Sequence, residues 1–300
     1  MTLNGRLVRS ISGFYTIHTD QGDFLCRARG IFRLRGVTPL AGDFVTVEAL
    51  PDGSGSIIDV AERRNALARP PVCNIDALVV LVSEAVPRAD PYIIDKMAAM
   101  AAYRGIEIIL LINKCDLEPG DVLFEIYRTA GFPVVRASAL TGDGVKDLWP
   151  LIEGKCIALA GNSGVGKSAL INALESEYRA SSLPRPEPDV RVGPCRTGEV
   201  SERLGRGRHT TRHVELFALP RNVLAADTPG FAALDGLERI PAAALAVCFP
   251  DFAPYLDGCR FTGCLHGEGQ KGCAVRDAVD GGRIHPSRYA SYLKMLGEPS

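Results

Sequence analysis

A glycine-rich segment at residues 161–168 has the composition and spacing of a phosphate-binding loop. It reads Gly-Asn-Ser-Gly-Val-Gly-Lys-Ser and follows the apolar run Cys156–Ala160. Glycines let backbone N–H groups converge on an anion, and a helix starting there adds the positive end of its dipole. Lys167 would reach the β- and γ-phosphates, and the Ser168 hydroxyl would ligate Mg²⁺. We expect the nucleotide-binding residues here to be Gly161, Asn162, Ser163, Gly164, Val165, Gly166, Lys167, Ser168 and Ala169.

The run Asn113-Lys114-Cys115-Asp116 indicates which base is bound, a question that the phosphate loop alone leaves open between ATP and GTP. The Asp116 carboxylate can accept hydrogen bonds from guanine N1–H and the 2-amino group, whereas adenine would leave it unpaired. Asn113 and the Lys114 stem would brace the pocket. In the run Ser138-Ala139-Leu140, a backbone N–H could reach guanine O6. These residues favour GTP.

Two further segments suit Mg²⁺ and the γ-phosphate. Asp227-Thr228-Pro229-Gly230 follows an apolar strand pattern, so Asp227 could hold Mg²⁺ through water and the Gly230 N–H could sense the γ-phosphate. A threonine hydroxyl from Thr210 or Thr211 would complete the Mg²⁺ shell. The sequence does not decide between them, and we favour Thr210, which with Lys167 belongs to the expected catalytic set.

The glutamine that many GTPases use to orient the attacking water is replaced here by Phe231, which follows Gly230 and has no group for that task. His209 is the nearest candidate, since imidazole can accept a proton near neutral pH. Packing or RNA binding by His209 is the alternative, and without another group the enzyme would be slow.

A cysteine and histidine cluster in the C-terminal region predicts a metal site. Cys259, Cys264, His266 and Cys273 supply three thiolates and one imidazole within 15 residues, a complete tetrahedral set for structural zinc. Cys248 lies in an apolar stretch and is interpreted as a core residue. Such a small segment would bury little core, so we expect one zinc ion to contribute to its folding.

The elements that must position these residues fall into three parts. Residues 1–68 alternate in short strand patterns separated by Gly and Asp turns, with no convincing helical period, which is typical of a small barrel. Residues 72–232 alternate apolar strands with helices, which predicts a mostly parallel α/β sheet with helices on both faces. Residues 233–300 combine helical stretches with the metal cluster.

Composition limits the alternatives. The chain has 300 residues, 46% of them hydrophobic, a net charge of −1 and nine cysteines. No apolar run is long enough for a membrane span, and the start lacks the apolar core of a secretion signal. We therefore expect a cytoplasmic protein with no membrane partner. Nothing suggests a dimer seam, so we expect a monomer.

The motifs occur in an unusual order, with the base-reading motif before the phosphate loop, the threonine switch and Asp227–Gly230. GTPases usually begin with the phosphate loop and end with the base-reading motif. The chain therefore looks like a circularly permuted P-loop GTPase domain, an arrangement that preserves the fold when the old termini are close together.

The combination resembles the bacterial GTPase family that depends on the small ribosomal subunit, called RsgA or YjeQ. The stretches that carry the resemblance cover nearly the whole chain: Asn74-Ile75-Asp76, Asn113–Asp116, Gly161–Ser168, Gly207–Thr211 and the Cys259–Cys273 cluster. The resemblance implies an N-terminal OB-fold, a C-terminal zinc-binding module, GTP hydrolysis stimulated by the small subunit, and a role in its late maturation. In that family the histidine matching His209 is proposed to act in catalysis.

Basic residues with nearby aromatics suggest where rRNA would bind. Arg27, Arg29, Arg33 and Arg35 lie close in sequence to Phe24 and Phe32, and arginines 203, 206, 208 and 212 form a second basic group. An ordinary charged strand face is the alternative for the first group. For the whole chain, the alternatives are a permuted GTPase acting on another ribonucleoprotein and a GTP-dependent RNA-binding module with negligible turnover. A third alternative, which the base-reading motif disfavours, is an ATPase.

Overall fold

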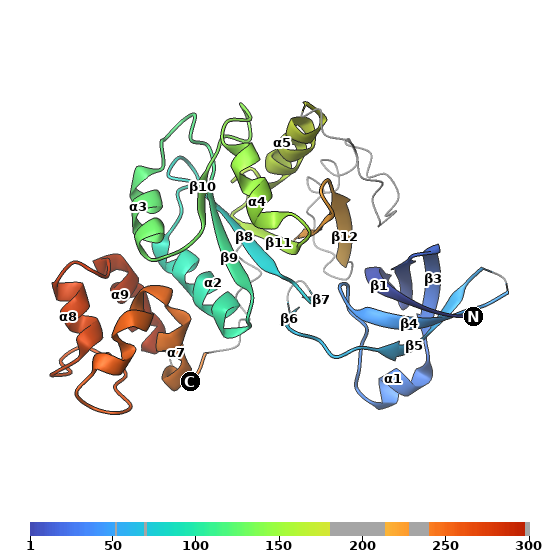
Figure 1. The fold of residues 1–300 in the computed structure, drawn as a ribbon, viewed down its shortest axis with the longest axis horizontal. Helices are drawn as coiled ribbons and strands as arrows, with labels where there is room; N and C mark the ends of the chain where they lie inside the picture. The colour runs from blue at the N-terminus through green and yellow to red at the C-terminus, as the bar shows by residue number, and fades with distance from the viewer. Residues whose placement is uncertain (52, 69–70, 181–213, 228–239, 298–300) are drawn as a thin grey trace.

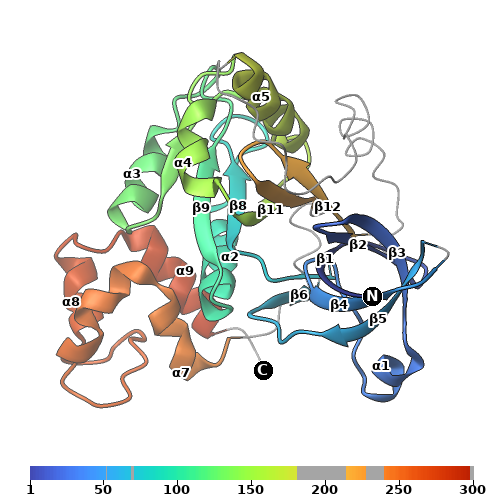
Figure 2. The ribbon, with the colours of Figure 1, turned by 45° about the vertical axis from the view of Figure 1, so that its right-hand side comes forward.

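The computed structural model describes residues 1–51, 53–68, 71–180, 214–227 and 240–297. These residues form an N-terminal barrel, a central α/β sheet and a helical C-terminal module. Figure 1 shows the barrel and the module on opposite sides of the central sheet, and Figure 2 shows the same arrangement after rotation.

The barrel is built from five strands that close on themselves. The strands are β1 (Thr2–Ile11), β2 (Phe14–Thr19), β3 (Gly22–Ala28), β4 (Phe44–Ala49) and β5 (Gly55–Val60). Their order is β1-β2-β3-β5-β4, and β4 pairs back to β1, so this small sheet leaves no open edge among its own strands. This closed five-stranded arrangement agrees with the expected OB-fold. The short helix α1 (Gly30–Leu34) was not expected, because five residues carry too little of a helical period.

A short hairpin connects the barrel to the central sheet. Its strands are β6 (Ala66–Ala68) and β7 (Pro71–Cys73), and β6 lies at the end of the range that the sequence analysis gives to the barrel. Asn74 and Asp76 follow it and contact both neighbouring parts of the chain.

The central sheet confirms the expected mostly parallel α/β architecture. Its order is β10-β9-β8-β11-β13-β12, and every neighbouring pair is parallel except β12–β13. The strands are β8 (Ala77–Val82), β9 (Glu107–Ile112), β10 (Val134–Arg136), β11 (Cys156–Gly161), β12 (Val214–Leu219) and β13 (Val223–Asp227). The connections reverse direction between β8 and β11, which is where open α/β sheets bind ligands, at the carboxyl ends of the strands.

Helices cover both faces of this sheet. They are α2 (Pro91–Tyr103), α3 (Asp121–Thr129), the 3-10 helix η1 (Val145–Leu148), α4 (Trp149–Ile152) and α5 (Lys167–Ala180). Alternate residues of β8 divide between two cores, because Leu78 and Val80 pack with α2 and α3 whereas Val79 and Leu81 pack with α4 and α5. Burial on both faces explains why the strands read as continuous apolar runs.

The C-terminal module consists of short helices around a separate core. They are α7 (Ala242–Leu245), η3 (Ala246–Cys248), η4 (Pro250–Gly258), α8 (Ala274–Asp280) and α9 (Pro286–Leu296). Phe249, Phe252 and Tyr292 are buried there, and Ala99 of α2 belongs to the same cluster. The module is therefore packed against the outer side of α2.

Candidate functional site

The predicted phosphate loop connects β11 to the first turn of α5, as its sequence indicates. Gly166 has φ of +105°, and a Cβ there would lie 2.3 Å from Nδ2 of Asn113, so only glycine fits. Lys167 begins α5, and its Nζ donates to the carbonyl of Gly161 at 2.7 Å. The ammonium group therefore lies across the loop at the end of the helix where an anion is favoured.

Asn113 joins the three segments that the sequence assigned separately to base and phosphate binding. It is only 2% exposed, and its Nδ2 donates to the Val165 carbonyl in the phosphate loop at 2.8 Å. Its Oδ1 accepts from the Ala139 N–H at 2.9 Å. The side-chain amide thus fixes the phosphate loop, the end of β9 and the Ser138-Ala139 step relative to one another.

The remaining base-reading residues lie at the same edge. Lys114 has φ of +65°, and its Nζ donates to the Val86 carbonyl at 2.7 Å, which holds the aliphatic stem in place. Asp116 is exposed to solvent, as a group that receives a ligand must be. Ser138 is buried, and its Oγ accepts from the Thr141 N–H.

Two exposed leucines near these residues have no packing role that explains them. Leu117 is 67% exposed in the loop after β9, and Leu140 is 84% exposed in the loop after the neighbouring strand β10. Leu117 was missed by the sequence analysis, because a leucine next to a polar motif is ordinarily assigned to a core. Apolar side chains beside an exposed carboxylate suit a planar, polar-edged ligand.

Several predicted residues lie outside the described part of the chain. These are His209, Thr210, Thr211, Gly230 and Phe231, together with the arginines between residues 203 and 212. For Asp227 only the backbone is described, at the end of β13, where it pairs with Leu159 of β11. That pairing places its Cα on the strand next to the one that leads into the phosphate loop.

The predicted metal ligands converge in the C-terminal module. Donor atoms of Cys259, Cys264, His266 and Cys273 all lie within 4.8 Å of one another. Nδ1 of His266 is 3.5 Å from Sγ of Cys259 and 3.4 Å from Sγ of Cys273, and those two sulfurs are 4.0 Å apart. Donors around a tetrahedral zinc ion stand about 3.5–3.8 Å apart, so the residues fit the ion.

Burial shifts the pKa values of the ligands, and neighbouring tyrosines hold the loop that carries them. Burial lowers the pKa of His266, which favours the neutral imidazole that binds metals, and burial raises the pKa of the Cys273 thiol to about 11. A cation is therefore needed to stabilise a thiolate there. The hydroxyls of Tyr289 and Tyr292 donate to the carbonyls of His266 and Leu265, both at 2.8 Å, so α9 holds the ligand loop.

A buried ionic cluster attaches this module to the central domain. Arg288 of α9 is 1% exposed and contacts Asp95 of α2, while its Nη2 donates to Asp251 at 2.7 Å. Tyr127 of α3 donates to the same Asp95 carboxylate at 2.9 Å. Burial raises the pKa of Asp95 even though Arg288 opposes that effect. A paired charge at this depth favours one docking position, since separating the partners would leave an uncompensated charge.

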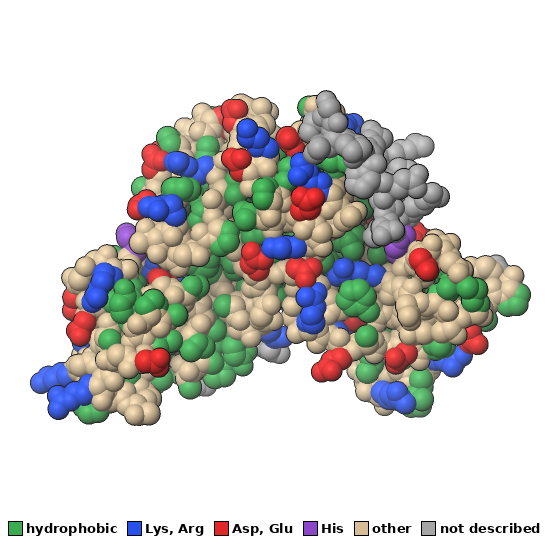
Figure 3. All heavy atoms as spheres, viewed as in Figure 1, with side chains coloured by type: hydrophobic (Ala, Val, Ile, Leu, Met, Phe, Trp, Pro, Cys, Tyr) green, Lys and Arg blue, Asp and Glu red, His purple; other side chains and the backbone are tan. Residues whose placement is uncertain are grey.

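The barrel presents basic and aromatic side chains, although not all those that the sequence suggested. Phe32 is buried and cannot offer its ring, and Phe24 packs against the barrel core. The exposed rings belong to Phe14, which lies 4.5 Å from the Arg27 guanidinium, and to Phe44, which lies 5.0 Å from that of Arg6. Figure 3 shows basic and acidic side chains interspersed over the junction between the barrel and the central sheet.

No helix among the described residues combines the length and apolar character that crossing a bilayer requires.

Comparisons with known proteins cover nearly the whole chain. The RsgA N-terminal domain family matches residues 4–57, and the RsgA GTPase family matches residues 60–237. The small ribosomal subunit biogenesis GTPase RsgA of Caldanaerobacter subterraneus is 40% identical, with 99% of this chain and 95% of that protein covered. The protein of the same name from Geobacillus thermodenitrificans is 39% identical, with 98% and 96% covered.

Solved structures agree with these sequence matches. The crystal structure of YjeQ from Thermotoga maritima has a TM-score of 0.79 at 32% identity, covering 99% of this chain and 98% of that one. That of YloQ, described as a circularly permuted GTPase, has a TM-score of 0.77 at 30% identity, covering 99% and 95%. The predicted permuted order of motifs is thereby confirmed.

Proposed function

The chain belongs to the RsgA family of circularly permuted GTPases, and from this we propose that it binds GTP, hydrolyses it on the small ribosomal subunit and assists late maturation of that subunit. The observation that carries the proposal is the buried Asn113 amide, which joins the phosphate loop to the base-reading loops. A nucleotide that spans both loops then meets binding groups in one fixed arrangement, which limits the entropy lost on binding.

The guanine base would bind beside the exposed Asp116. Its carboxylate accepts the N1–H and 2-amino hydrogens. The Ala139 N–H already donates to Asn113 Oδ1, so in this proposal the donor to O6 is the N–H of Leu140, the next residue of the same loop. Leu117 and Leu140 supply exposed apolar surface in these loops, and the Lys114 stem is held by its hydrogen bond to Val86. This combination favours guanine over adenine.

The triphosphate would lie on the loop from Gly161 to Ala169, with Lys167 neutralising the β- and γ-oxygens. The Ser168 hydroxyl and, in our proposal, Thr210 hold Mg²⁺, which balances phosphate charge when bound. In the same proposal, Asp227 would hold Mg²⁺ through water and the Gly230 N–H would contact the γ-phosphate. His209 orients water in this scheme. The alternative keeps His209 as an RNA-contacting residue.

One structural zinc ion would be bound by Cys259, Cys264, His266 and Cys273, because these donors already have near-tetrahedral spacing. We also propose the domain boundaries 1–68, 72–232 and 233–300, a monomeric state, and a cytoplasmic location, since the ribosomal partner is found there.

A hydrolysis assay tests the main proposal. Purified small subunits should raise the GTP turnover rate of the full chain by at least about tenfold, because a partner that completes a GTPase site in trans can raise turnover by about 10³–10⁵-fold. Purified large subunits serve as the matched control. Equal stimulation by large subunits would favour a permuted GTPase with another partner. Unchanged phosphate release with either subunit would favour an RNA-binding module without turnover.

For the barrel, we propose that rRNA bases stack on Phe14 beside Arg27, on the β2–β3 face that OB-folds use for nucleic acids. Phe14→Ala should weaken binding to small subunits by about tenfold, because stacking of one base contributes about 1–3 kcal/mol. Filter binding or sedimentation measures the effect. Val122→Ala, an equally apolar and exposed change on α3, is the control. Equal affinities of the Phe14 variant and the wild type would refute this assignment.

A further inference from the structure

The first strand of the barrel belongs to two sheets at once. β1 pairs with β2 and β4 inside the barrel, and near its end it also pairs antiparallel with β12 through Arg9↔Glu215 and Ser10↔Val214. The barrel and the GTPase sheet therefore form one continuous eleven-stranded sheet. β12 is the outermost strand of the GTPase part, and the end of β1 pairs with the first two residues of its otherwise open edge (Figure 1).

This contact lies at the nucleotide end of the GTPase sheet. β12 runs antiparallel to β13, with Leu216 opposite Ala226, so the beginning of β12 is next to the carboxyl end of β13. β13 is parallel to β11, and β11 leads into the phosphate loop. An unbroken ladder of backbone pairing thus connects the end of β1 to β11, the strand that leads into the phosphate loop.

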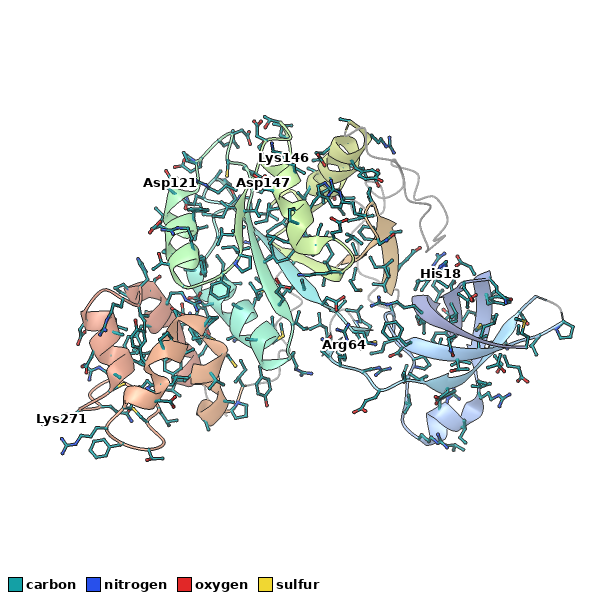
Figure 4. All side chains as sticks on the ribbon, in the orientation of Figure 1. His18, Arg64, Asp121, Lys146, Asp147 and Lys271 are labelled. Carbon is teal, nitrogen blue, oxygen red and sulfur yellow. The ribbon has the colours of Figure 1, made fainter. Side chains whose placement is uncertain are left out.

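A second contact fixes the other part of β1 to the opposite end of the sheet. Arg6 Nη2 donates to the Asn74 carbonyl at 3.0 Å, and Asn74 Nδ2 donates to the Gly42 carbonyl at 3.0 Å. Asp76 accepts from the N–H of Cys156, the first residue of β11, at 2.8 Å. Arg64 also contacts Asn74 and Asp76, and Figure 4 shows it between the barrel and the central domain.

The two contacts differ in strength. At the Asn74 contact, that residue is buried and the backbones are tightly packed. A Cβ added to Gly42 would lie only 2.0 Å from the carbonyl oxygen of Cys73. The β12 contact consists of two residue pairs and an exposed ion pair, with Arg9 and Glu215 3.7 Å apart and 44% and 35% exposed. A register shift in the β1–β2 pairing, between Leu7 and Arg9, separates the two contacts. The weaker contact is therefore the one that opens first.

We propose that the β1–β12 pairing is a nucleotide-dependent latch, which opens and closes while the barrel stays attached at Asn74. The latch makes barrel orientation depend on the state of the phosphate end, and it rests on the proposed GTP binding. Because coupling between two sites is reciprocal, RNA bound to the barrel would in turn change nucleotide affinity.

Hydrogen exchange on the full chain tests the latch without ribosomes. Amides in residues 9–11 and 214–216 should exchange at rates that differ by about tenfold between GDP and a non-hydrolysable GTP analogue, within the usual range of coupling. If exchange in a phosphate-loop peptide depends on the nucleotide but exchange in these two segments does not, the latch is overturned. A phosphate-loop peptide that is also unresponsive would overturn GTP binding, and the latch with it.

Charge reversal supplies a second test. Arg9→Glu places like charges at the contact and should remove the nucleotide dependence of exchange in residues 214–216, and the double variant Arg9→Glu/Glu215→Arg should restore it. Arg29→Glu is the matched control, because Arg29 pairs with Glu48 inside the barrel. The proposal fails if Arg9→Glu retains the full dependence, if the double variant does not restore it, or if Arg29→Glu abolishes it equally.

Discussion

Asp116→Asn should lower the affinity for GTP by about 10²- to 10³-fold. The asparagine N–H₂ group cannot accept from the 2-amino group, and the bond from N1–H loses its charged acceptor, while one hydrogen bond to a charged group contributes about 1.5–3 kcal/mol. The same change should improve binding of xanthosine triphosphate. Xanthine carries an oxygen in place of the 2-amino group, and the new amide can donate to that oxygen while still accepting from N1–H. Asp116 is exposed, so the fold should be unaffected.

Titration calorimetry with GTP, ATP and xanthosine triphosphate measures this change in specificity. Glu118→Gln is the matched control, because it removes one exposed carboxylate from the same loop without altering the proposed base contact. An Asp116→Asn protein that binds GTP as tightly as the wild type would show that the base lies elsewhere. Tighter binding of ATP than of GTP by the wild type would instead support an adenine-specific site.

The relative placement of the nucleotide motifs could be predicted because a parallel sheet brings the carboxyl ends of its strands to one edge. The sequence therefore located Asn113 and Lys167 in the same region. It could not give the contact between Asn113 and the carbonyl of Val165, because loop conformation decides which backbone atoms face each other. The roles of His209 and Thr210 stay predictions.

The barrel shows why strand patterns leave the direction of side chains undecided. Phe24 and Leu25 are consecutive apolar residues of β3, so alternation does not indicate which one faces inward. In the structure Phe24 packs inward and Leu25 is exposed, and the aromatic surface comes from Phe14 and Phe44 instead. Closure of β4 onto β1 decides this, and it pairs residues more than 35 positions apart.

Arg288 was missed for a related reason. An arginine in a helical tail is ordinarily exposed, and no local pattern predicts that Asp95, 193 positions earlier, will lie against it. Only the docking of α9 on α2 makes the pair, and the rings of Phe132 and Phe249 lie within 5.0 Å of the guanidinium. Long-range packing, more than local sequence, therefore sets the position of the C-terminal module.

Cys273→Ser should release the zinc ion and unfold the C-terminal module. Cys273 is buried and is the N-cap residue of α8. A zinc ion bound to it would therefore connect the ligand loop to that helix. Binding of structural zinc contributes about 10–16 kcal/mol in small domains, which exceeds what a core of this size can supply. Metal analysis should give one zinc per wild-type chain and none in the variant, with fast hydrogen exchange across residues 242–296.

Cys248→Ser separates loss of the metal from damage to the module core. Cys248 is also buried, but its thiol donates to the Ala244 carbonyl and takes no part in the ligand cluster. The Cys248→Ser protein should therefore keep its zinc ion. GTP affinity should remain near that of the wild type in both variants, because the nucleotide loops lie at the carboxyl edge of the sheet and the module contacts α2. Full zinc content in Cys273→Ser, or zinc loss in Cys248→Ser, would contradict the assigned ligand set.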